Sequence, residues 1–184
     1  PWHIDVMTGD VLQGLVDRVM AQDHLFPKGE GAEYPIHPEN LIDPYNARRW
    51  ECAEDMYGSV NIARDDRAGR IHQYSQNLRF FGAPVGFMYT IHRSMGQGHW
   101  ADMGMLLQSV MLTARAEGLH TCPQQVWAMW PKTVSEYLKV PDDRMIFCGM
   151  GLGYMDTDHP INNWRTTRQD IDDFTTFAGF DDPA

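Results

Sequence analysis

Long apolar runs are missing from this sequence of 184 residues. No stretch approaches the roughly 18 consecutive apolar residues that a membrane-spanning helix requires. The first residues also lack the basic segment followed by an apolar one that marks an export signal. We therefore expect a cytoplasmic protein that does not use a membrane.

Cysteine is scarce, with only three residues, Cys52, Cys122 and Cys148. Their odd number, wide spacing and lack of a Cys-x-x-Cys pair argue against a disulfide framework and against a zinc ribbon. The eight histidines are scattered without the spacing of metal ligands. The sequence therefore predicts no metal site and fits a reducing compartment.

Basic residues are few: 15 Lys and Arg stand against 25 Asp and Glu, for a formal charge of -10. Such a balance repels a phosphate backbone unless a local basic stripe overrides it, and none is visible. Nucleic acid is therefore not expected as a partner.

The common catalytic motifs are missing too, including the Walker loop, His-Glu-x-x-His and Gly-x-Ser-x-Gly. The run Gly149-Met150-Gly151-Leu152-Gly153 superficially suggests a dinucleotide-binding loop. Its glycines are two residues apart throughout, which favours close packing against a strand instead.

Large, polarizable side chains are plentiful: 12 Met, 6 Trp, 7 Tyr and 8 Phe. They suit a flat aromatic ligand or an extensive subunit interface, and an ordinary core equally well.

Hydrophobic periodicity predicts a mixture of strands and helices in one domain spanning residues 1–184. The order lacks the regular alternation of a doubly wound fold, which indicates an α+β class. Residues 24–50 are expected to form a long loop or lid, and residues 172–184 an extended C-terminal arm. The expected strands are 2–8, 85–92 and 144–154, and the expected helices are 12–20, 45–64, 69–81, 100–117 and 130–138.

The helix predicted at 100–117 has an apolar surface wider than a single-faced surface helix needs, since Met105, Leu106 and Leu112 widen its stripe. This pattern indicates a central helix, buried in the core or in a dimer interface.

Four segments carry a resemblance: Pro1-Trp2; 77–84; 100–112 with 118–123; and 140–141 with 149–154 and 165–168. Taken together and in this order, they resemble the nitroreductase family over essentially the whole chain. The resemblance implies a mixed, mostly antiparallel sheet surrounded by helices, and a homodimer that binds FMN between its subunits. The family's usual N-terminal Arg-Arg-Ser-x-Arg element, which contacts the flavin phosphate and ribityl chain, is absent from this sequence.

The resemblance also assigns cofactor-binding roles. Arg168, with Arg165 as a second candidate, is expected at the flavin phosphate, a task for which the guanidinium fork is suited. Asn77 and Arg79 resemble positions at the polar edge of the flavin, although a role at a helix end on the surface is equally open. The remaining expected contacts come from Pro1 and Trp2 and from the loop Pro123-Gln124-Gln125, whose backbone would lie against one face and the N5 edge of the ring.

No catalytic side chain is expected, because the flavin carries the chemistry. The predicted activity is transfer of electrons from NADH or NADPH through FMN to a nitroaromatic or similar small aromatic acceptor, by a ping-pong mechanism. The pocket for that acceptor is expected to include His37, Tyr45, Trp127 and Trp130, although for any single one of them ordinary core or interface packing is the commoner role. The alternatives are a flavin-binding protein without turnover, and a relative with dehalogenase or flavin-fragmenting chemistry.

Overall fold

A four-stranded sheet forms the centre of the computed structural model, which describes residues 1–180. The strands lie in the order β1-β2-β4-β3, and all three pairings are antiparallel. The α+β class and the antiparallel character expected from the sequence are confirmed. The strands are β1 (Trp2–Thr8), β2 (Val85–His92), β3 (His120–Gln124) and β4 (Arg144–Gly153).

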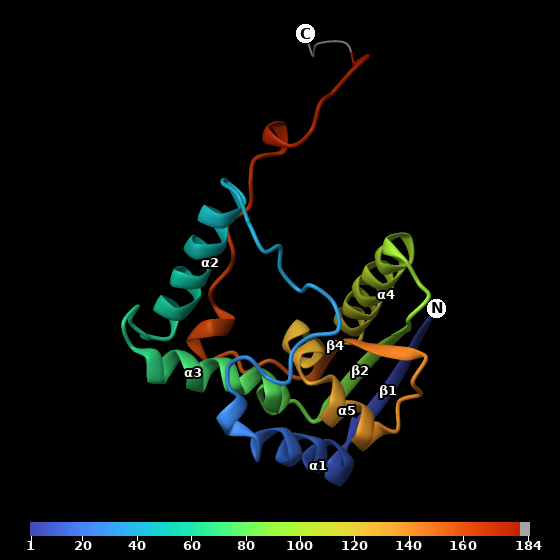
Figure 1. The fold of residues 1–184 in the computed structure, drawn as a ribbon. Coiled ribbons are helices and arrows are strands. Elements are labelled where there is room, and N and C mark those ends of the chain that lie inside the picture. Colours follow the sequence, from blue (N-terminus) through green and yellow to red (C-terminus); the bar gives the residue numbers. More distant parts are fainter. Residues whose placement is uncertain (181–184) are drawn as a thin grey trace.

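Residues 1–180 also form five α-helices and several 3-10 turns, and α1, α4 and α5 lie against the sheet (Figure 1). The helices are α1 (Gly9–Met20), α2 (Tyr45–Ser59), α3 (Arg67–Gln76), α4 (Gln97–Ala116) and α5 (Pro131–Leu138). The 3-10 turns are η1 (Asp23–Leu25), η2 (Asn77–Gly82), η3 (Gln125–Met129), η4 (Pro160–Asn162) and η5 (Ile171–Asp173).

Each face of the sheet carries its own apolar core, because successive side chains of a strand point to opposite faces. On one face, Met7, Met88 and Ile146 pack with residues of α1, α5, η2 and η3. On the other face, Tyr89, Ile91 and Met150 pack with residues of α4. The strands therefore lie between two layers, which explains why β2 and β4 are apolar almost throughout.

Helix α4 is covered on one side only. Met103 and Ala114 are buried against the sheet, whereas Met105 and Leu112 are each 61% exposed. Gly118, at φ +77°, follows the end of the helix as predicted. The wide apolar surface expected for this helix is thus present, and within the described chain its Met105 and Leu112 side remains exposed.

The long loop expected at residues 24–50 is shorter in the structure. Its start forms η1 and its last six residues belong to α2, so only residues 26–44 are irregular. Two cis X-Pro bonds, at Phe26-Pro27 and Asp43-Pro44, lie at the ends of this segment.

Helices α2 and α3 and the C-terminal segment project away from the sheet (Figure 1). Helix α2 has no buried residue. Of the C-terminal arm expected at 172–184, the first two residues belong to η5, the rest of the described part exposes Phe174, Phe177 and Phe180, and residues 181–184 lie outside the described part. Within residues 1–180, none of the helices combines the length and apolar character needed to cross a lipid bilayer.

Candidate functional site

The turn η2 holds two predicted cofactor residues in a strained backbone. Asn77 is half-buried and donates its Nδ2 to the Tyr74 carbonyl at 3.0 Å, whereas Arg79 is exposed. Phe80 and Phe81 follow at φ 50° and 51°, a left-handed conformation that costs about 1–2 kcal/mol for each such residue. This turn is therefore kept in place by its packing and not by its own preference.

That packing joins η2 to η3. The ring of Phe80 stacks on Trp127, with centroids 4.6 Å apart and planes 24° apart. Both side chains are buried in the apolar core that the sheet forms with α1 and α5. The structure therefore brings the segment of Asn77 and Arg79 beside the segment that begins at Gln125.

A loop was predicted for Pro123 and Gln124, but the structure places both residues in a strand. They are the last residues of β3, and Gln125 begins η3 immediately afterwards. Strand β3 is at the edge of the sheet, where a proline without an N–H group is tolerated. The backbone at this position is thus fixed by pairing with β4, Gln124 lying opposite Gly149.

Gln124 carries an unused donor. Its side chain is 2% exposed, and its Oε1 accepts a hydrogen bond of 3.3 Å from Trp127 Nε1. Its Nε2 is buried without a hydrogen-bond partner among residues 1–180. Because a buried donor without a partner costs about 1–3 kcal/mol, this amide group is available to an additional acceptor.

Pro1 and Trp2 lie at the opposite edge of the sheet from β3. The Pro1 carbonyl accepts a bond of 3.2 Å from the His92 amide, and Trp2 is paired with Ile91. Three strand spacings separate β1 from β3, which amounts to about 14 Å. A single chain therefore does not bring Pro1 and Trp2 into contact with Gln124.

The two predicted phosphate ligands lie in the segment that follows β4. Arg165 Nη1 donates to the carbonyls of Asn162 (2.6 Å) and Trp164 (2.7 Å). Arg168 Nη1 donates to the hydroxyl and carbonyl of Thr166 and to the next carbonyl along the chain. Both side chains are exposed, and their segment runs past α2 and α3 on the side away from the N-terminus (Figure 1).

The four predicted pocket residues divide between the core and the surface. Trp127 is 0% exposed and Trp130 is 1% exposed, with the Trp130 ring edge-on to Phe26 at 5.5 Å. Both tryptophans therefore pack in the core of the described chain. His37 and Tyr45 are exposed, the first in the irregular segment and the second at the start of α2.

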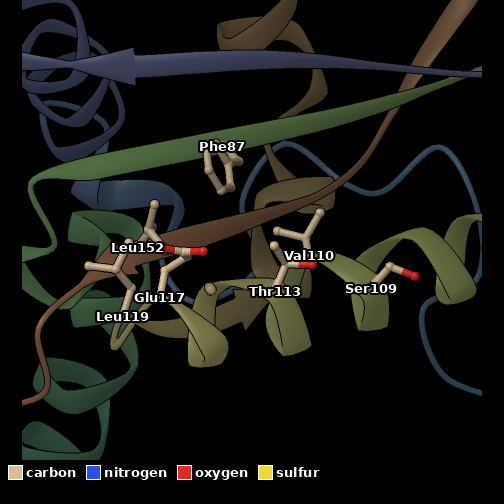
Figure 2. A pocket seen from close by; sticks show the side chains of 8 residues that line it. Phe87, Ser109, Val110, Thr113, Glu117, Leu119 and Leu152 are labelled. Atoms are coloured by element: carbon tan, nitrogen blue, oxygen red, sulfur yellow. The ribbon is translucent and has the colours of Figure 1, made fainter.

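An apolar groove of about 390 Å³ lies between α4 and the sheet. Figure 2 shows Phe87 of β2 and Val110 of α4 pointing into it from opposite sides, with Leu119 and Leu152 at one end. Glu117 is its only ionisable lining residue, and none of the predicted site residues lines it. An anionic carboxylate in an apolar wall does not suit a phosphate, so this groove fits an apolar partner.

Sequence reasoning missed two residues that anchor the irregular segment to the rest of the fold. The Glu30 carboxylate accepts hydrogen bonds from the backbone of Lys132 and from the backbone and hydroxyl of Thr133, at the start of α5. Tyr34 is buried against β4 and α4. Their partners, which include Lys132 for Glu30 and Trp100 for Tyr34, are distant in sequence, so no local pattern could have identified them.

Ionisable groups in the described part of the chain do not assemble into a metal site. No group of three or more His, Cys, Asp or Glu side chains is arranged to hold an ion within residues 1–180.

Comparison with known proteins adds the identity of the fold. The model of the family described as the Nitroreductase family matches residues 21–154. A 4-nitrobenzoate reductase of Pseudomonas putida is 38% identical over 98% of this chain and 78% of its own length.

Two solved structures have the same architecture. The FMN and NADPH-dependent nitroreductase NfnB of sphigopyxis sp. strain HMH is 44% identical, with a TM-score of 0.93 over 98% of this chain and 81% of its own. The FMN-dependent nitroreductase NfnB of Mycobacterium smegmatis, solved in complex with NADPH, is 26% identical, with a TM-score of 0.88 over 97% of this chain and 79% of its own.

Proposed function

Because the chain belongs to the nitroreductase family, we propose that it passes electrons from NADPH or NADH through FMN to a nitroaromatic acceptor. The observation that supports this proposal most strongly is the similarity to the sphigopyxis enzyme, with 44% sequence identity and a TM-score of 0.93. When bound, FMN would supply the electron-carrying chemistry. The protein's own residues bind and orient the reactants.

The residues present fit an FMN. The free Nε2 of Gln124 is a buried donor beside the segment proposed to meet the N5 edge, and Gln125 is exposed next to it. Arg168, with Arg165, offers exposed guanidinium groups for the phosphate. Asn77 and Arg79 would serve the polar edge of the ring, and Pro1, Trp2 and Pro123 would complete its surroundings.

We propose further that the working unit is a homodimer with the flavin between its subunits. In one chain the proposed ligands are separated by the width of the sheet, and the uncovered side of α4 exposes Met105 and Leu112. A second copy would cover this surface and the apolar groove, and it would bring the two groups of ligands together.

The dimer is tested by adding a charge to that surface. Met105→Glu should convert the protein to a monomer in sedimentation or native mass measurements and should release FMN. Val11→Glu is the matched control, since Val11 is a half-exposed apolar residue on α1, on the other side of the sheet. A Met105→Glu protein that stays dimeric would contradict the proposed interface.

The activity is tested on the FMN-loaded protein by its visible absorption. Under anaerobic conditions NADPH should bleach the flavin band, and 4-nitrobenzoate or nitrobenzene added afterwards should restore it. Parallel double-reciprocal lines would support the ping-pong order, whereas converging lines would refute it. A bound flavin that NADPH and NADH both fail to bleach would instead indicate a flavin-binding protein without turnover.

A further inference from the structure

A polar pocket of about 150 Å³ lies where the first half of β1 and the start of β4 pass the C-terminal end of α5. Its walls carry the ionisable side chains of His3, Asp5, Lys139 and Arg144, and Thr90 lines it from β2. The volume has room for several water molecules, and therefore for a small tetrahedral anion. The residues that line it include none of those assigned above to the flavin or to the acceptor.

The pocket lies on the face of the sheet that α1 and α5 cover. His3, Asp5 and Met7 share one side of β1 because successive side chains alternate, and Met7 belongs to the core with α1 and α5. Ile4 points the other way and packs with residues of α4. The pocket is therefore on the opposite face of the sheet from the α4 surface proposed for the dimer.

Thr90 has a hydroxyl group that the described chain leaves unused. The residue is 0% exposed, yet its Oγ1 has no hydrogen-bond partner within residues 1–180. Its strand partners are His3 and Ile146, so Thr90 lies between the β1 and β4 walls of the pocket. A buried hydroxyl without a partner destabilises the fold unless a bound water or ligand completes its hydrogen bonds.

Arg144 supplies a cation without a partner. It is half-buried, and within residues 1–180 its guanidinium takes part in no ion pair and no side-chain hydrogen bond. The neighbouring carboxylate of Asp143 lies 3.5 Å from His92 instead and does not line the pocket. The backbone is fixed here, since the Arg144 amide donates to the Pro141 carbonyl at 3.0 Å. The guanidinium is thus available to an anion, for which its fork of donors is suited.

The Asp5 carboxylate lines the same pocket as the two cations, Lys139 and Arg144. Its Oδ1 lies 3.5 Å from His3 Nε2, which leaves Oδ2 without a partner in the described chain. An ionised carboxylate only accepts hydrogen bonds, so it repels an anionic oxygen that carries no proton. Inorganic phosphate keeps a proton near neutral pH, whereas sulfate has none. A phosphate monoester loses its proton above a second pKa of about 6.

We propose that this pocket is a binding site for inorganic phosphate. Arg144 and Lys139 donate hydrogen bonds to its unprotonated oxygens, and the Thr90 hydroxyl finds its missing partner on the anion. Asp5 accepts a hydrogen bond from the oxygen that keeps its proton, and it excludes sulfate and phosphate monoesters. The inference stands apart from the proposed flavin chemistry, because no residue assigned to the flavin takes part in it.

The experiment titrates inorganic phosphate, sulfate and phenyl phosphate into the purified protein at pH 8 and measures binding by calorimetry. Phosphate should bind with a dissociation constant on the order of 1 mM, as expected for a few charge-assisted hydrogen bonds in an open pocket. Sulfate and phenyl phosphate should bind more weakly by about tenfold or more, because each leaves the Asp5 carboxylate unsatisfied. Absence of phosphate binding, or equal binding of all three anions, would overturn the proposal.

Two variants and a matched control tie the binding to the pocket. Arg144→Met and Lys139→Gln should both weaken phosphate binding, the first by about tenfold to a hundredfold, because each removes charge-assisted hydrogen bonds. Arg67→Met is the control, since it removes the same charge from an exposed position at the start of α3. Equal weakening by Arg144→Met and Arg67→Met would show a response to overall charge alone and would overturn the site.

Thr90→Val and Asp5→Asn test the remaining ligands. Thr90→Val should weaken phosphate binding while it raises the melting temperature, since it removes a buried hydroxyl that has no partner when phosphate is absent. Asp5→Asn should let sulfate bind about as well as phosphate, because an amide can donate to an unprotonated oxygen. Unchanged phosphate binding in Thr90→Val, or continued rejection of sulfate by Asp5→Asn, would refute the role given to that residue.

Discussion

Gly149→Ala is the substitution whose effect the structure specifies most closely. A Cβ at this position would lie 2.9 Å from Cγ and Nε1 of Trp127, and closer still to Cδ1. Trp127 cannot move aside easily, because it is fully buried, stacked on Phe80 and hydrogen-bonded to Gln124. The added methyl group therefore overpacks the core.

The expected loss of stability follows from two contributions. Overpacking a dense core costs about 1–3 kcal/mol, and displacing Trp127 from its stack on Phe80 costs about 0.5–1.5 kcal/mol more. A total of about 1.5–4.5 kcal/mol is a large share of the roughly 5–15 kcal/mol that stabilises a typical domain. In urea the unfolding midpoint should fall by about 1–2 M.

The assay is urea unfolding followed by circular dichroism at a fixed protein concentration, since association would shift the midpoint. Gly58→Ala is the control, because it adds the same methyl group in α2 with no atom within 4 Å. It should leave the midpoint unchanged or raise it, because alanine is more stable than glycine inside a helix by about 0.5–1 kcal/mol. A Gly149→Ala protein of normal stability but altered KM for nitroaromatics would refute the reasoning, because Trp127 would then line a pocket with room to move.

Three further predictions concern other parts of the molecule. Glu30→Gln should lower the free energy of unfolding by about 1 kcal/mol in urea melts, because a neutral amide caps the start of α5 less well than the carboxylate does. Native thiol labelling followed by mass spectrometry should modify exposed Cys52 and spare Cys148, whose pKa burial raises to about 12. The Arg70 guanidinium holds the pKa of Glu54 below its usual value, so their pair contributes stability above the ordinary carboxyl range and loses it as pH falls through the lowered pKa. The difference in urea midpoint between wild type and Arg70→Met should therefore be larger at pH 7 than at pH 3.

Periodicity predicted the parts of the fold whose burial follows a regular pattern. Strand β2 matches its predicted span, and α4 and β4 begin or end within a few residues of theirs, because long apolar stripes constrain both period and length. The helix expected at 69–81 is instead α3 followed by η2, since Phe80 and Phe81 turn left-handed. Tertiary packing imposes that left-handed conformation, and no local sequence pattern predicts it.

The candidate site was less accessible to sequence reasoning. An aromatic residue looks the same in a pattern whether it lines a pocket or fills a core, so Trp127 and Trp130 could not be placed in advance. The resemblance implied a loop at Pro123, yet the residue lies in an edge strand, which accommodates a proline. Tyr34 gave no signal, since its burial depends on Trp100 and Phe147, which are distant in the chain.

The glycines of β4 connect the fold to the candidate site. Gly149, Gly151 and Gly153 alternate with larger residues, so they share one face of the strand and leave it smooth. A Cβ on Gly151 would lie 3.0 Å from the Phe80 carbonyl, and one on Gly153 would lie 2.7 Å from Pro84 Cδ. The smooth face thus admits the left-handed turn of η2 and, at Gly149, the indole ring of η3.

This arrangement explains why the strain at Phe80 and Phe81 is tolerated. Burying the Phe80 ring contributes about 1.5–3 kcal/mol, and its stack on Trp127 about 0.5–1.5 kcal/mol more, which is comparable to the cost of two left-handed residues. Side chains on the glycine face would push η2 and η3 outward and separate Asn77 and Arg79 from Gln125. The repeated glycines, which resembled a nucleotide-binding loop in the sequence, therefore act as a packing surface that sets the spacing between two segments proposed to hold the flavin.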